Sequence, residues 1–139
     1  MAFTIRPVDY YYVNVRAEIG AAYSVLSSLA ERGVNLLAFT AVPTGPTLEQ
    51  FTLFPEDPNL FVAESQAAQI PLDGPHHALL VEGDDELGSL ADLHEWLDEA
   101  GVEIYASSGV TDSHGTFGYV VYVREDQFQR ACNVLGLND

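Results

Sequence analysis

The feature that most constrains the fold of this chain is an internal repeat. When residues 17–38 are aligned with residues 85–106, seven of the 22 positions are identical. The alignment continues at Thr47 and Thr116, where the offset between the two repeats is one residue larger. Such a change is expected when an insertion falls in a loop. The chain should therefore fold as two similar units. The seven identical pairs are Glu18 and Glu86, Gly20 and Gly88, Leu29 and Leu97, Glu31 and Glu99, Gly33 and Gly101, Val34 and Val102, and Ala38 and Ala106.

The first repeat alternates strand and helix patterns. Runs rich in aromatic and β-branched residues predict strands, and apolar residues at helical spacing predict two helices. Gly33 stands where the first helix should end, and Asp57-Pro58 stands where the second should begin. The expected elements are strands at Tyr10–Arg16, Val34–Val42, Leu48–Phe54 and Gln69–Leu72, and helices around Ala22–Leu29 and Pro58–Ala68.

The second repeat follows the same order but has little room for a fourth strand, because only four residues follow Leu135. We expect Phe3–Ile5, which Pro7 separates from the first repeat, to supply the missing sheet edge. The other expected elements are strands at His77–Glu82, Glu103–Val110 and Phe117–Val123, and helices around Leu90–Leu97 and Glu125–Leu135.

The order βαββαβ predicts an α+β fold with two ferredoxin-like modules, each an antiparallel sheet with its helices on one face. We place module 1 at residues 1–73 and module 2 at residues 74–139. A module of about 65 residues buries only a small core, so pairing with another module should add stability. We therefore expect tandem pairing and a homodimer.

The charge balance argues against two classes of partner. The chain has 21 acidic residues and five basic ones, all arginine, which gives a net charge of −16. Nucleic acids and anionic membranes both require clustered cations, so neither partner is expected. The N-terminus has no signal-peptide pattern, and the single cysteine, Cys132, allows no internal disulfide. These features favour a cytoplasmic protein.

A glycine stands where the first strand should turn into the first helix. Such a glycine allows a ligand to approach the backbone closely, and the first N–H groups of a helix lack internal partners and attract a carboxylate. Gly20, Ala21 and Ala22 could hold a ligand carboxylate in this way, with Glu18 available for an ammonium group. The glycine is equally compatible with a purely structural role in a tight turn.

The same residues resemble the ACT domain family. Its pattern is a strand, a turn of the form Asp-x-Pro-Gly, a helix, and Gly-Ile/Val-Asn-Ile opening the second strand. Gly20 and Gly33–Leu36 match this pattern in the first repeat, and Asp85 and Gly88 match the turn in the second. The resemblance implies a stand-alone regulator that binds an amino acid between modules and acts on an enzyme partner. The ligand-binding residues that it implies are Glu18, Ile19, Gly20, Ala21, Ala22 and Asn35, and Asp85, Leu87, Gly88 and Ser89.

We expect no catalytic residue, no metal site and no cofactor, and therefore no enzyme. His76 and His77 lie in an expected linker and should point to opposite faces, which makes a poor chelate. Asp112 and His114 share one turn, unlike the partners of a catalytic triad. No phosphate-binding loop or dinucleotide fingerprint is present. Two other functions stay open: an interaction module without a small ligand, and an enzyme on a ferredoxin-like scaffold.

Overall fold

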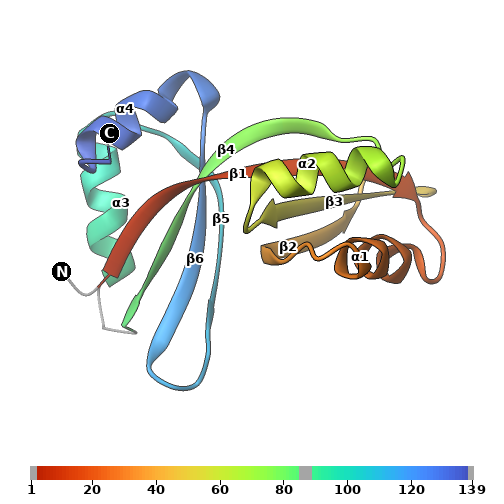
Figure 1. The fold of residues 1–139 in the computed structure, drawn as a ribbon. Coiled ribbons are helices and arrows are strands. Elements are labelled where there is room, and N and C mark those ends of the chain that lie inside the picture. Colours follow the sequence, from red (N-terminus) through yellow and green to blue (C-terminus); the bar gives the residue numbers. More distant parts are fainter. Residues whose placement is uncertain (1–2, 85–88, 138–139) are drawn as a thin grey trace. The chain divides into compact units, whose positions relative to one another are not determined.

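A computed structural model of the chain describes residues 3–84 and 89–137. It divides into two compact units, one of them Asp9–His76 and the other made of the residues up to Val8 together with His77 onward. The expected modules were residues 1–73 and 74–139. The structure differs in that the first residues of the chain, up to Val8, belong to the same unit as the second half. Each unit is described by itself below (Figure 1).

The unit Asp9–His76 has the strand order β2-β3-β1-β4, in which β4 contributes its first residues. Strand β3 is antiparallel to β1, with Tyr11 opposite Leu53 and Arg16 opposite Leu48, and β2 is antiparallel to β3. This is the order expected for one ferredoxin-like module. Its elements are β1 (Phe3–Arg16), α1 (Ala21–Glu31), β2 (Leu36–Pro43), β3 (Leu48–Pro55), α2 (Pro58–Ala67) and the start of β4 (Asp73–Asp84).

The other unit has the strand order β1-β4-β6-β5, to which β1 contributes its first residues. The Thr4 hydroxyl donates a hydrogen bond to the Glu82 carbonyl at 3.3 Å, so Phe3–Ile5 supplies the missing strand, as predicted. Strands β4 and β6, and β5 and β6, are antiparallel. Its remaining elements are α3 (Ser89–Glu99), β5 (Ile104–Thr111), β6 (Thr116–Val123), a 3-10 turn at Glu125–Gln127 and α4 (Phe128–Val134).

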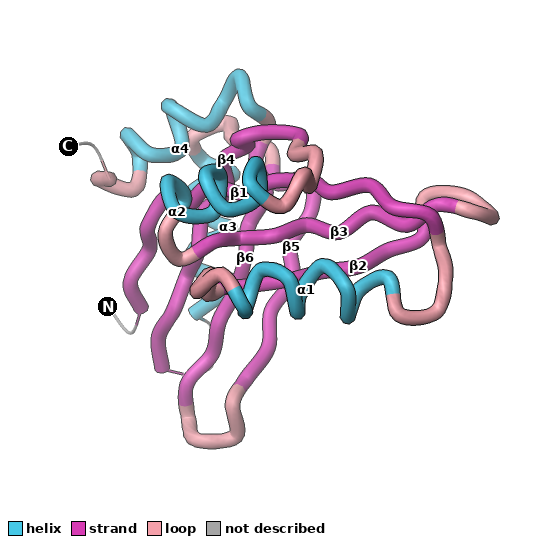
Figure 2. The backbone as a smooth tube through the Cα atoms, turned by 45° about the vertical axis from the view of Figure 1, so that its right-hand side comes forward, coloured by secondary structure: helices cyan, strands magenta, loops and turns pink. Residues whose placement is uncertain are grey.

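In each unit both helices cover the same sheet face, as Figure 2 shows for α1 and α2. Leu29 of α1 and Phe61 of α2 share one buried cluster with alternate residues of β1 and β3, such as Tyr11 and Leu53. In the other unit, α3, α4 and alternate strand residues form the second cluster. The alternation arises because successive strand side chains point to opposite faces. The α+β class and the helices on one face are therefore confirmed.

Three expected boundaries are wrong. Strand β1 continues through Pro7 instead of ending there, which is tolerated because this part of β1 is the outer strand of its unit. Gln69–Leu72 forms no strand. Strand β4 begins at Asp73 and not at the expected His77, so it includes His76, which was expected in a linker.

Candidate functional site

The turn between β1 and α1 is the first candidate site, and Gly20 forms it. Gly20 caps α1 with φ 87° and ψ 0°, in the left-handed region that glycine adopts without steric cost. No heavy atom other than those of its chain neighbours lies within 4 Å of the position that a Cβ would occupy. The backbone at this corner is therefore open to a small molecule.

The first amides of α1 are partly unused. The Ala21 N–H donates to the Glu18 carbonyl at 3.2 Å, and the Gly20 carbonyl accepts the Ser24 N–H at 2.9 Å, which starts the helix. No side chain caps this end, and no acidic residue lies in the first turn. The Ala22 and Tyr23 N–H groups have no hydrogen-bond acceptor among the described residues. They are the orphan donors that a carboxylate or water must satisfy.

The residues next to these amides in the sequence include exposed side chains. Glu18 is exposed, Ile19 is fully exposed, and Tyr23 is 75% exposed. Exposed apolar side chains mark a binding surface where they form a contiguous patch. The sequence reasoning missed Tyr23, although an aromatic residue off the apolar stripe of α1 was a signal that could have identified it.

The remaining predicted site residues stand in other segments of the sequence. Asn35 follows the opposite end of α1, a helix about 16 Å long at the rise for 11 residues. Its carbonyl accepts the Glu56 N–H at 2.9 Å. Ser89 is the first residue of α3. Asp85, Leu87 and Gly88 lie outside the described residues. The equivalent turn of the second repeat stays a prediction.

The histidines have separate partners. His76 contacts Asp73 at 3.2 Å and the ring of Tyr12, whereas His77 contacts Glu125 at 3.3 Å and the ring of Phe128. They thus point to opposite faces of β4, as predicted. Within residues 3–84 and 89–137, no three His, Cys, Asp or Glu side chains are grouped so that they could hold a metal ion.

Asp112 stabilises the turn between β5 and β6. Its carboxylate accepts hydrogen bonds from the Thr116 hydroxyl and from the backbone N–H groups of His114 and Thr116. These hydrogen bonds lower the pKa of Asp112; the one from the Thr116 hydroxyl has the largest effect, followed by the one from the His114 amide. The His114 ring hydrogen-bonds the Asp112 carbonyl and not its carboxylate, at 2.9 Å. This carboxylate therefore orders a turn and does not orient a catalytic base.

Helix length bears on the membrane question. No helix in the described part of the chain is long and apolar enough to cross a membrane.

No family model and no curated protein matches the sequence. Solved structures do match. A Bacteroides thetaiotaomicron protein has TM-score 0.79 at 14% identity over 95% of this chain and 88% of its own. The regulatory subunit of aspartate kinase from Thermus thermophilus has a TM-score of 0.59 at 15% identity, over 98% of this chain and 95% of its own. A structure of aspartokinase alpha and beta subunits has a TM-score of 0.59 at 18% identity, over 97% of this chain and 95% of its own. The chain has the tandem ACT-like fold.

At these identities the likeness establishes the fold and not the activity. The ACT-like arrangement places two βαββαβ modules in one chain, and in the first of them a strand-to-helix corner follows β1. The corner at Gly20 is the one whose amides the structure describes.

Proposed function

We propose that this protein is a regulator that binds a free amino acid at the turn between β1 and α1. The observation that carries the proposal is the pair of unpartnered N–H groups of Ala22 and Tyr23 behind the left-handed Gly20. Oriented N–H groups at a helix start, together with the helix dipole, favour a carboxylate. The open space at Gly20 permits the close approach that such hydrogen bonds require.

A free amino acid also carries an ammonium group. The exposed Glu18 carboxylate is two residues before Gly20 and is the nearest acidic group in sequence to the amides. Ile19 and Tyr23 would contact the apolar part of the ligand. Carboxylate recognition by backbone and ammonium recognition by Glu18 together favour a zwitterion over a simple anion.

The fold supports a regulatory role. Two of the similar structures are described as a regulatory subunit of aspartate kinase and as aspartokinase subunits. By analogy, this chain would form a homodimer, act on a separate enzyme, and perform no catalysis itself. The second repeat would bind a ligand at the corner that contains Asp85, Leu87, Gly88 and Ser89.

A thermal-shift screen with the twenty amino acids tests the proposal, because a ligand that binds the native state raises the melting temperature. A positive amino acid should also shift the backbone NMR signals of Ala22 and Tyr23. Glu18→Gln should weaken binding about fivefold, as expected for an exposed ion pair, whereas Glu31→Gln, at the other end of α1, should not. A screen without any shift would contradict the proposal.

A second function, a protein-interaction module without a small ligand, is favoured by the exposure of Ile19 and Tyr23. Exposed apolar groups of this size also suit a protein partner. In that case, Ile19→Ser with Tyr23→Ser should lower self-association measured by sedimentation. The amino acid screen would then give no shift.

A further inference from the structure

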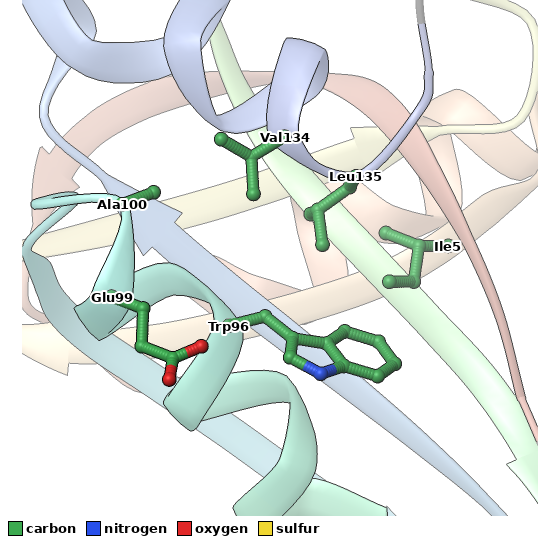
Figure 3. A pocket seen from close by; sticks show the side chains of 6 residues that line it. All are labelled: Ile5, Trp96, Glu99, Ala100, Val134 and Leu135. Atoms are coloured by element: carbon green, nitrogen blue, oxygen red, sulfur yellow. The ribbon is translucent and has the colours of Figure 1, made fainter.

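A pocket lies in the unit that contains α3 and α4, whereas the Gly20 turn belongs to the other unit, Asp9–His76. It has a volume of about 560 Å³, within the range of small-molecule sites. In Figure 3 the side chains of α3 and of the end of α4 border the same space, with β1 at its side. The lining residues are Ile5, Trp96, Glu99, Ala100, Val134 and Leu135.

The walls of this pocket are apolar. Trp96 is held in place by Phe3, with ring centroids 6.0 Å apart and planes at 48°. Val134 is 44% exposed, so an apolar surface faces solvent at the end of α4. Burying this surface and the indole face under a hydrocarbon group would be favourable.

Among the six residues that line the pocket, Glu99 is the charged one. The Glu99 carboxylate is exposed and has no hydrogen bond or ion pair with any described residue. It stands at the C-terminal end of α3, where the helix dipole is negative, and no basic residue lies in the last turn. The Arg130 guanidinium donates to the Ala100 carbonyl at 3.4 Å, and no ion pair between Arg130 and Glu99 is present in the described residues. The net charge of −16 adds attraction for cations.

We propose that this pocket binds an apolar organic cation: a molecule with an aromatic or branched hydrocarbon body and one ammonium group. The body lies on Trp96 and Val134, and the ammonium group pairs with Glu99 and faces the indole, which also attracts cations. A carboxylate-bearing ligand is disfavoured because its anion would lie beside Glu99. The pocket therefore selects a different class of molecule from the amino acid proposed at the Gly20 turn.

The chain provides its own reporter, since Trp96 is the single tryptophan. We would titrate the whole protein with 2-phenylethylammonium chloride and follow Trp96 fluorescence, excited where tyrosine does not absorb. We expect a saturable change with a dissociation constant on the order of 1 mM. Phenylacetate, which has a similar ring but a negative charge, and phenylalanine should give no saturable change.

Two matched variants separate the local charge from the net charge. Glu99→Gln should weaken binding of the amine about fivefold, whereas Glu95→Gln, an exposed position on the same helix outside the pocket, should leave it unchanged. Both variants should melt at the temperature of the unmodified protein, because both positions are exposed.

Three results would overturn this proposal: no saturable change in fluorescence, equal binding of phenylacetate, or equal weakening by the two substitutions. A change in Trp96 emission with protein concentration alone would mean that a second copy occupies the pocket, which also overturns it. None of these results bears on the turn at Gly20, which the amino acid screen tests separately.

Discussion

The His94 Nε2 atom lies 2.6 Å from the hydroxyl oxygen of Tyr119, which joins α3 to β6 inside one unit. The two ring centroids are 5.9 Å apart. His94 stands where the first repeat has Leu26, so the second repeat has a hydrogen-bonding side chain at a position that is apolar in the first. Tyr119 is only 7% exposed, and a buried polar group without its partner is costly.

Removing the Tyr119 hydroxyl should therefore destabilise the chain. We expect Tyr119→Phe to lower the free energy of unfolding in urea by about 1 kcal/mol, because His94 loses its partner. Combining it with His94→Leu, which restores the leucine of the first repeat, should recover most of that loss. Strict additivity of the two substitutions in a double-mutant cycle would show that the contact is not energetically coupled.

The same tyrosine explains why residue 109 is glycine. Tyr119 is directly opposite Gly109 in the pairing of β5 and β6, and a Cβ at Gly109 would lie 2.8 Å from Tyr119 Cδ1. Gly109→Ala should lower the free energy of unfolding by about 1–3 kcal/mol, since the ring must move and strain its hydrogen bond to His94. Gly118→Ala is the matched control, because a Cβ there meets nothing within 4 Å and should leave stability unchanged or slightly higher. If both variants lost the same free energy of unfolding, the cause would be the replacement of any strand glycine and not the contact with Tyr119.

The internal repeat and the spacing of apolar residues were sufficient to predict the fold. They failed where a distant contact decides the local conformation. Asp73-Gly74-Pro75 has the composition of a turn, yet it belongs to β4, where Gly74 packs closely against the Tyr11 ring and the Tyr10 carbonyl. Local composition carries no information about such a partner.

The two candidate sites also differ in how far the sequence alone could predict them. The turn at Gly20 is local, so the sequence alone indicated the open amide of Ala22, but it also named Ala21, whose N–H donates to the Glu18 carbonyl, and it missed Tyr23. The pocket at Trp96 was not predicted, because Ile5, Trp96 and Val134 come from three distant segments that only the folded unit brings together.

The two repeats use equivalent aspartates differently, which gives a third prediction. Asp57 caps α2, where its carboxylate accepts the Leu60 N–H at 3.2 Å, whereas its counterpart Asp126 forms an exposed ion pair with Arg124 at 3.1 Å. Asp57→Ala should lower the free energy of unfolding by about 1 kcal/mol, and Asp57→Asn should cost much less because the amide oxygen still accepts. Asp126→Ala should cost less than about 1 kcal/mol. Similar losses at the two positions would contradict the assigned roles.

The last prediction concerns the pH dependence that Cys132 contributes. This thiol is buried in α4, and burial raises its pKa above the ordinary value. The unfolded chain releases the thiol proton near its usual pKa of about 8.5, whereas the folded chain holds it to higher pH. The stabilising contribution is therefore fully present below that pH and is lost as pH rises through the folded pKa.

Urea unfolding at pH values from about 7 to 9.5 measures this contribution, a range that precedes most tyrosine ionisation. The free energy of unfolding should fall more steeply with pH in the unmodified protein than in Cys132→Ala, whatever the cavity costs at neutral pH. The thiol should also react with a thiol reagent at pH 8.5 far faster in urea than in the native state, because only the unfolded chain exposes a thiolate. Parallel pH profiles for the two proteins, or rapid labelling of the native chain, would show that Cys132 is not held protonated by burial.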